Sequence, residues 1–124
     1  DLHSFPTRRS SDLAIPSKRV SLAQEIKDLQ DQCLETKEES IIAAQCGMAS
    51  RPSRTHVLQE LEVPILFIIG KNDPRIPTEL ALSQAMLARH AEILLLDNVA
   101  HMAHLEEREY VKPRLRNFVQ TCYL

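Results

Sequence analysis

The sequence has no long apolar segment and no large excess of charge of one sign. None of its apolar runs approaches the roughly 20 residues that a membrane-spanning helix needs. The formal net charge of -2 gives no electrostatic reason to expect binding to nucleic acid or to an anionic membrane surface. What remains is a common balance of 44% hydrophobic and 26% charged residues over 124 residues, enough for one small domain with a core. Nucleic acid and membranes are therefore not expected as partners.

Cysteine is also scarce, and its pattern does not suggest disulfides. The chain has three cysteines, Cys33, Cys46 and Cys122, so their number is odd and their spacing is wide. Such a set predicts reduced thiols in an intracellular, cytoplasmic protein rather than a disulfide framework. No pair of cysteines has the spacing of a zinc finger, so no metal site is expected from them.

The first 13 residues lack helical and strand periodicity, and they lack the apolar core of a signal peptide. Within them, residues 5–12 read Phe-Pro-Thr-Arg-Arg-Ser-Ser-Asp, which resembles the translation of a sequencing-library adapter. A disordered native arm is the alternative, but a match over eight consecutive residues favours the adapter. We therefore expect residues 1–13 to be non-native and the natural protein to begin before residue 14.

The segment before the first strand predicts three helices. Residues 22–35 place apolar side chains at helical spacing. Ser21, with Gln24 three residues later, is typical of a capping box at the start of this helix. A second helix is predicted over 38–49 and a short third one over 55–61. The second helix offers these apolar side chains for burial: Ile41, Ile42, Ala44, Cys46 and Met48.

Two apolar runs without alternation predict strands that are buried on both faces, as in a parallel sheet. They cover 63–69, with Pro64 near the start, and 93–96. A helix over 77–89 separates them, so the three elements form a βαβ unit with a right-handed crossover. The fold class is therefore α/β, with two parallel strands and flanking helices.

A closing helical segment is predicted over 107–122. Pro113 lies inside it and removes one helical hydrogen bond. We therefore expect either a break near Lys112 or a helix that starts at Pro113.

A carboxylate and an imidazole follow the two predicted strands. Asp73 comes after the first strand and the turn 70–72, and His101 comes after the second strand and the loop 97–100. Sites in open α/β sheets form at the carboxyl ends of strands, and neighbouring strands lie about 4.8 Å apart, so these side chains can meet. An aspartate that accepts a hydrogen bond from imidazole fixes its tautomer, and the histidine then takes a proton from a nucleophile. Asp73 and His101 are therefore the candidate catalytic residues.

Each candidate has a structural alternative. Asp73 could cap a turn or a helix, and His101 could be a hydrogen-bonded loop histidine. The accompanying Gly70 and Pro77 favour the catalytic interpretation of the pair. His104, three residues beyond His101, is expected to pack or hydrogen-bond nearby, because no further ligands support a metal pair there.

The segments around the two residues carry a family resemblance. Residues 70–77 read Gly-Lys-Asn-Asp-Pro-Arg-Ile-Pro, similar to the Gly-x-x-Asp-x-x-x-Pro segment that carries the acid of α/β-hydrolases. Residues 98–106 resemble the segment with the catalytic histidine of that family. The family's chain order is serine, then acid, then histidine, and this chain has the last two in that order. The resemblance implies that Asp73 is the acid and His101 the base of a catalytic triad.

The resemblance also implies a division of the chain. Residues 44–52 look like the return from the family's helical cap into the sheet. Residues 1–13 are then a non-native segment, 14–53 a remnant of the helical cap, and 54–124 the C-terminal part of the α/β-hydrolase core. The resemblance covers roughly 16–124.

The sequence departs from the family in several respects, one of which is Pro113 in the final helix. Ala100 stands where a glycine usually precedes the histidine, and neither a Gly-x-Ser-x-Gly nucleophile elbow nor the oxyanion-hole loop is present. The resemblance then implies a fragment of a serine-type hydrolase that acts on a small-molecule ester or related carbonyl substrate. It implies no metal and no organic cofactor, and the fragment is expected to be inactive without its nucleophile and oxyanion donors. The alternative is a non-enzymatic α/β binding module, or a relative with an altered nucleophile.

Overall fold

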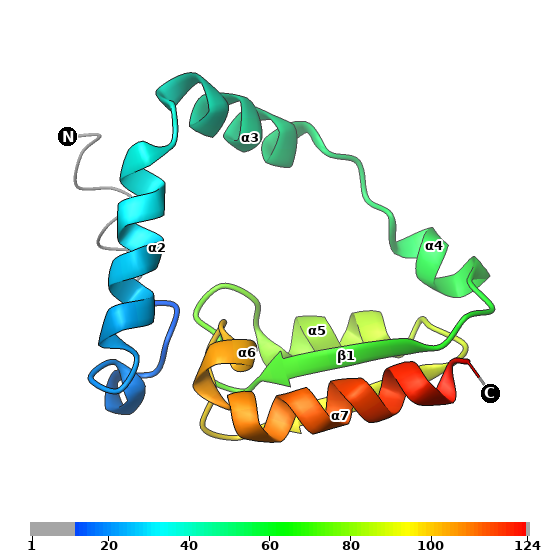
Figure 1. Cartoon of the computed structure of the whole chain (residues 1–124). Helices are drawn as coiled ribbons and strands as arrows, with labels where there is room; N and C mark the ends of the chain where they lie inside the picture. The colour runs from blue at the N-terminus through cyan, green and yellow to red at the C-terminus, as the bar shows by residue number, and fades with distance from the viewer. Residues whose placement is uncertain (1–11, 124) are drawn as a thin grey trace.

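Figure 1 shows the chain as a computed structural model, in which residues 12–123 are described. Of the segment predicted to be non-native, only Asp12 and Leu13 fall inside the described part. The elements follow one another in this order: η1 (Pro16–Lys18), α2 (Ala23–Glu35), α3 (Glu38–Ser50), α4 (Thr55–Glu60), β1 (Ile65–Gly70), α5 (Thr78–Ala85), β2 (Ala91–Leu96), α6 (Ala103–Glu106) and α7 (Arg108–Thr121).

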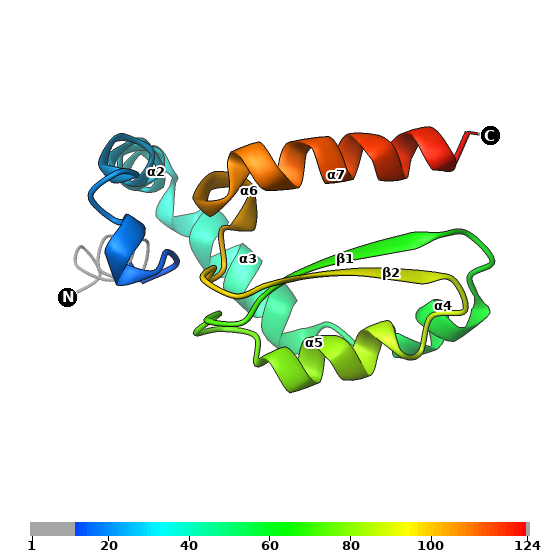
Figure 2. The same ribbon diagram turned by 90° about the horizontal axis from the view of Figure 1, so that it is seen from below.

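The two strands form a parallel sheet between helices. Their register runs from Ile65 opposite Ala91 to Gly70 opposite Leu96. α5 connects the strands and lies on one side of the sheet, whereas α7 lies on the other side (Figure 2). The predicted α/β class, with one helix between two parallel strands, is confirmed. Both strands end at the same edge of the sheet, where the loops to α5 and α6 begin.

The strand ends differ from the prediction by a few residues. β1 begins at Ile65 rather than at 63, since Pro64 has no N–H to offer to a ladder. The N–H of Ile65 donates to the carbonyl oxygen of His90 over 2.8 Å. α5 ends at Ala85, four residues short of the predicted end, so the chain reaches the sheet early and β2 begins at Ala91.

Burial of both strands on both faces was predicted, and this prediction is wrong. Ile93 and Leu95 of β2 remain 41% and 38% exposed, and in β1 only Ile69 and Gly70 are buried. Two strands with one helix on each side leave much of the sheet open to solvent. The core forms instead around the carboxyl ends of the strands, from Leu96, Val99 and Val111 with Ile68, Leu94 and Ala103 packed against them.

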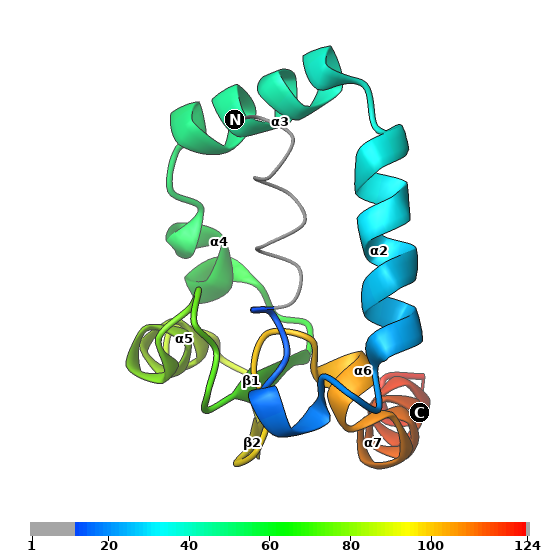
Figure 3. The same ribbon diagram turned by 90° about the vertical axis from the view of Figure 1, so that its left-hand side faces the viewer.

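The helices of the first half extend away from the sheet. α2, α3 and α4 form an open arch that leaves the sheet near α6 and returns to it at the start of β1 (Figure 3). α3 has no buried residue, and Ile42 and Met48 are 54% and 59% exposed, so the predicted burial of its apolar side chains is not found. Only the beginning of this half reaches the core, through a second cluster of Ala14, Leu22 and Ile26 with Leu105 packed against it.

The predicted capping box at the start of α2 is wrong. The Ser21 hydroxyl donates to the carbonyl oxygen of Lys18 over 2.9 Å, and the Gln24 side-chain amide donates to Oδ1 of Asp28 over 2.7 Å. A turn over residues 19–22 separates η1 from the helix, and the serine hydroxyl bonds back to the last residue of η1 instead of capping the helix. α2 begins one residue later than predicted, at Ala23.

α7 runs through Pro113 without a break, contrary to the prediction. A proline inside a helix removes one hydrogen bond, and its ring crowds the preceding turn. Side-chain contacts close to the proline support the helix there. Val111 is buried in the core, and the Arg114 guanidinium lies 5.2 Å from the centre of the Tyr110 ring.

Gly70 ends β1 at the point where the loop after β2 crosses it. A Cβ atom at this position would lie 2.1 Å from the carbonyl oxygen of Ala100 and 2.6 Å from that of Val99. No described residue has a positive φ, so the constraint on Gly70 is space and not backbone angle. The N–H of Asn72 donates to the Val99 carbonyl over 2.9 Å and fastens the two loops together.

The proline in α7 makes a stability prediction. Pro113→Ala should raise the free energy of unfolding by up to about 3 kcal/mol, because the alanine N–H restores the helical hydrogen bond and the ring clash disappears. Urea unfolding followed by circular dichroism measures the change. Pro52→Ala is the matched control, since Pro52 lies outside any helix and should give no gain. A Pro113→Ala chain that is no more stable than the original would contradict the prediction.

The two glycines should respond in opposite ways to the same substitution. Gly70→Ala should lower the free energy of unfolding by at least about 2 kcal/mol, because the new methyl group collides with two backbone carbonyls that cannot move freely. Gly47 lies within α3, and a Cβ there meets nothing within 4 Å, so Gly47→Ala should stabilise by about 0.5–1 kcal/mol. Equal effects of both substitutions in a urea titration would show that the close approach at Gly70 does not exist.

Candidate active site

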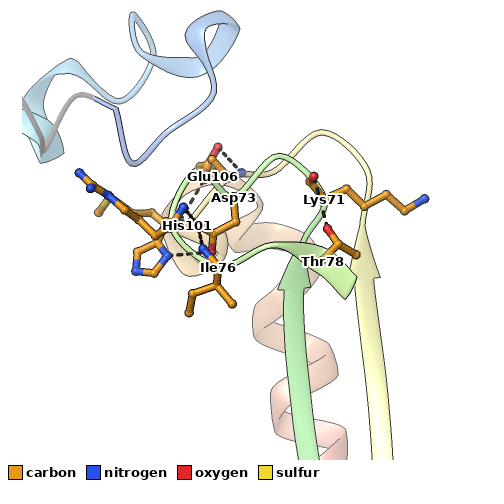
Figure 4. A network of polar contacts seen from close by, with 9 residues as sticks. Lys71, Asp73, Ile76, Thr78, His101 and Glu106 are labelled. Atoms are coloured by element: carbon orange, nitrogen blue, oxygen red, sulfur yellow. Dashed lines mark hydrogen bonds and ion pairs between the residues drawn. The ribbon is translucent and has the colours of Figure 1, made fainter. Parts of the chain in front are cut away.

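Asp73 and His101 lie in contact at the carboxyl end of the sheet (Figure 4). Nδ1 of His101 is 2.8 Å from Oδ2 of Asp73, which is a hydrogen-bond distance. Asp73 comes from the loop between β1 and α5, and His101 from the loop between β2 and α6. The structure thus brings together the two residues that the sequence analysis selected. A neutral imidazole in this contact carries its proton on Nδ1, which leaves Nε2 as a proton acceptor.

The backbone after Asp73 fixes the orientation of its carboxylate. Oδ1 accepts hydrogen bonds from the N–H groups of Arg75 and Ile76, over 2.7 and 3.1 Å. This is the turn that aspartate forms readily with its own following backbone. The side chain is 11% exposed. Asp73 therefore caps a turn with one oxygen and contacts His101 with the other.

The pKa of Asp73 reflects opposing influences. Partial burial of the carboxylate raises its pKa, whereas the hydrogen bond with His101 and those from the N–H groups of Arg75 and Ile76 lower it. The net result is a pKa below the ordinary value of 3.8. The group is therefore ionised at neutral pH, and an ionised aspartate in this position can stabilise a protonated imidazole.

The imidazole of His101 is open on the side away from Asp73. Its side chain is 37% exposed, and no hydrogen bond from residues 12–123 reaches Nε2. The backbone of the same residue is held, since its N–H donates to the carbonyl oxygen of Leu13 over 2.9 Å. A reacting group could therefore approach Nε2 while the residue itself stays in place.

The loop that carries His101 is among the best-buried parts of the chain. Val99, Ala100 and Met102 are 1%, 3% and 7% exposed. Ala100 fits where the resembling family usually has glycine, because no positive φ is required there. The departure that sequence analysis noted at this position therefore causes no backbone strain.

Glu106 is a polar residue of the site that sequence analysis missed. It is 7% exposed, and its carboxylate accepts hydrogen bonds from the N–H groups of Ala100, Met102 and Ile15. Glu106 ends the segment 98–106 that carries the family resemblance, but no role was predicted for it. The available signal was its position at the end of the segment that carries His101.

A small cavity lies beside the Asp73–His101 pair. Its volume is about 80 Å³, and Ile76 and Ala103 contribute to its walls together with both members of the pair. His104, by contrast, is exposed and does not line this cavity. The space next to the pair is thus apolar apart from the two side chains themselves.

The rest of the described chain offers few other sites. Among residues 12–123, no group of three histidine, cysteine, aspartate or glutamate side chains is placed to hold a metal ion. None of the helices in this part of the chain has both the length and the apolar character needed to cross a membrane. Cys33, Cys46 and Cys122 are free thiols.

Several solved structures resemble this one closely, although their sequences differ. A thermophilic esterase from Thermogutta terrifontis superimposes with a TM-score of 0.88 at 23% identity, over 97% of this chain and 44% of the esterase. An enol-lactonase from Burkholderia xenovorans LB400 gives 0.83 at 16% identity, over 95% of this chain and 45% of the lactonase. A 2-hydroxy-6-oxo-6-phenylhexa-2,4-dienoate hydrolase from Rhodococcus sp. strain RHA1 gives 0.71 at 20% identity, over 95% and 44%.

These matches fix the fold. No protein-family model matches the sequence, and no curated protein matches it. The chain spans less than half the length of the three structures described above. Over the part that it shares with them, nearly all of its residues superimpose, which confirms the predicted fold class. The chain has the α/β-hydrolase fold.

Proposed function

We propose that this chain carries the acid and the base of a serine-type hydrolase that cleaves an ester or a related carbonyl substrate. The observation that carries the proposal is the contact of 2.8 Å between Asp73 and Nδ1 of His101, with Nε2 left open. His101 takes the proton of the nucleophile through Nε2 as the nucleophile attacks the substrate carbonyl. It returns this proton to the leaving group, and an acyl-enzyme remains. Water then attacks the acyl-enzyme with the same histidine as base.

Asp73 contributes orientation and charge to this reaction. Its lowered pKa keeps it ionised throughout, so it stabilises the imidazolium that forms when His101 takes the proton. The two N–H groups that bind its other oxygen prevent it from rotating away from the histidine. A proton moves at Nε2 while the contact at Nδ1 stays in place.

The nucleophile is proposed to come from a part of the protein outside these 124 residues. Two observations support this. The sequence contains no Gly-x-Ser-x-Gly elbow, and the similar esterase, lactonase and dienoate hydrolase are all more than twice as long as the stretch that matches this chain. The oxyanion donors belong to the same missing machinery, so the chain alone is proposed to be inactive.

The reaction class is supported more firmly than the substrate. The similar structures are an esterase, an enol-lactonase and a dienoate hydrolase, which are hydrolases with different substrates. Their likeness to this chain is a likeness of fold. We therefore propose a small-molecule ester or related carbonyl compound as the substrate class and name no individual compound.

The acid–base pair makes a prediction about pH and stability. The pKa of Asp73 is lower in the folded chain than the value of 3.8 expected for the unfolded chain. The ionised carboxylate therefore contributes its full stabilisation of the fold above pH 3.8. This stabilisation is lost as the pH falls through the lower pKa of the folded chain. Asp73→Asn should therefore cost about 1–2 kcal/mol at pH 7, and the difference from the original chain should shrink below about pH 4. Urea unfolding, repeated at about every pH unit between pH 3 and pH 7, measures this difference in the free energy of unfolding.

The control for that experiment is Asp97→Asn. Asp97 is an exposed carboxylate paired with Lys71 in the neighbouring loop, so its substitution removes the same charge at a solvated ion pair. It should change the free energy of unfolding by less than about 1 kcal/mol. A cost of Asp73→Asn that is the same at every pH would contradict the lowered pKa.

The hydrolase proposal is tested by activity on an activated ester. The 124-residue chain should show no turnover above background. The full-length protein should be active, and His101→Ala should lower its kcat by about 10⁶-fold and Asp73→Asn by about 10⁴-fold. His104→Ala is the matched control, since this exposed histidine lies three residues away and should leave kcat unchanged.

Two outcomes would overturn this proposal. Turnover by the 124-residue chain that disappears in His101→Ala would show that the nucleophile lies within the chain. A complete upstream reading frame without any candidate nucleophile after a predicted strand would instead favour the non-enzymatic binding module, in which Asp73 and His101 have a purely structural role.

A further inference from the structure

We propose that Glu106 is a positioning residue for His101, which it holds through the backbone on either side of the histidine. The inference deepens the proposed function and rests on it for the role of His101. Glu106 does not touch the imidazole. It binds the peptide groups that precede and follow the histidine, and these groups determine the position of the Cα atom from which the imidazole extends.

The contacts of the Glu106 carboxylate define this role. Oε1 accepts from the N–H of Ala100 over 3.0 Å and from the N–H of Met102 over 3.1 Å. Oε2 accepts from the N–H of Ile15 over 2.9 Å and shares the N–H of Ala100 over 3.2 Å. Figure 4 shows Glu106 beside Asp73 and His101 at the end of the sheet. One side chain thus binds the residue before the histidine and the residue after it.

A carboxylate is well suited to this arrangement. All of its partners are N–H donors, and an ionised carboxylate offers acceptors only, on two oxygens. Hydrogen bonds to a charged acceptor are shorter and stronger than those to a neutral one. Burying a charged group costs stability unless hydrogen bonds or an opposite charge offset the loss of water. Within residues 12–123, no cation pairs with Glu106, so the backbone donors provide that compensation.

The backbone around His101 has a continuous set of partners as a result. The N–H groups of Ala100 and Met102 bind Glu106, and the N–H of His101 binds the carbonyl oxygen of Leu13. Three successive peptide N–H groups are therefore held. A catalytic group must stay within a fraction of an ångström of its productive position, because small displacements lower the rate strongly. The Asp73 contact restrains the ring, and Glu106 restrains its point of attachment.

The neighbouring residue Glu107 shows what an ordinary glutamate does here. Its carboxylate is 40% exposed and pairs with Lys18, and it makes no hydrogen bond to the loop of His101. Adjacent positions thus hold one buried glutamate bound to backbone and one partly exposed glutamate bound to a lysine. This pair supplies a matched control for the test.

The test is an NMR measurement on the 124-residue chain, uniformly labelled with ¹⁵N so that both the histidine rings and the backbone amides are observed. A hydrogen bond to Asp73 keeps the proton on Nδ1 of His101, which gives a strongly deshielded proton signal and the Nδ1–H tautomer. Exposed His56 and His90 provide the signals of unrestrained rings in the same sample. Asp73→Asn, which removes the charged acceptor directly, provides the reference for a broken contact.

Glu106→Gln keeps the size of the side chain but replaces one acceptor oxygen with a donor that faces N–H groups. We expect this variant to lose the Nδ1 proton signal of His101 and to shift its ring toward the tautomer pattern of the exposed histidines. The amide signals of β1 and β2 should stay in place. Glu107→Gln removes the same charge and should retain the His101 signal.

Hydrogen exchange on the unsubstituted chain gives a second measurement that does not depend on a variant. The amide protons of Ala100 and Met102 should exchange at least about tenfold more slowly than that of Asn98, which lies in the same loop without a backbone partner. Equal exchange rates would overturn the proposal, since they would show that Glu106 does not hold this backbone.

Other outcomes of the NMR experiment also decide the matter. An unchanged His101 signal in Glu106→Gln would overturn the positioning role. Loss of this signal together with the strand amides would overturn it too, because the carboxylate would then support the whole fold rather than the histidine. None of these readouts requires catalysis. An inactive full-length protein would therefore refute the hydrolase proposal and leave the coupling of Glu106 to His101 intact.

Discussion

The contact between Gly70 and the backbone of Val99 and Ala100 is the constraint on which the site depends. It allows the loop after β1 to lie directly against the loop after β2, with no side chain between them. The N–H of Asn72 then reaches the Val99 carbonyl, and the next residue along, Asp73, meets the imidazole. A larger residue at position 70 would push the loops apart and separate the acid from the base. The geometry of the contact between Asp73 and His101 thus follows from packing at the end of a strand.

The carboxylates of Asp73 and Glu106 lie in the same small region but bind different partners. Asp73 divides its oxygens between a turn and the histidine, and it stays ionised because these hydrogen bonds outweigh its partial burial. Glu106 lies deeper and binds only backbone N–H groups. In the proposed function, the first carboxylate stabilises a ring that gains charge, and the second fixes the position of a peptide segment. Burial and partners, rather than residue type, separate the two roles.

Much of the fold was predictable because its signals are local. Apolar runs marked both strands, and the helix between them required the parallel arrangement. The pair Asp73 and His101 could be selected since both follow strands that end at the same edge of the sheet. Features that depend on tertiary contacts were not predictable: the helix continues through Pro113 because Val111 is packed in the core, and Ser21 closes a turn rather than capping a helix. Glu106 belongs to this second group, because its donors come from both halves of the chain.

The site is also more self-contained than the open arrangement of the helices suggests. The hydrogen bonds that orient Asp73 come from the following turn and from the histidine, and those that hold the histidine backbone come from Leu13 and Glu106. α3, by contrast, buries nothing in this chain, and the middle of the sheet stays partly open. Burial and hydrogen bonds are therefore concentrated where the two loops meet, at the carboxyl ends of the strands. In the proposed reaction, a pair held in this way is organised before a nucleophile or a substrate arrives, which is the condition under which an acid and a base contribute most to the rate.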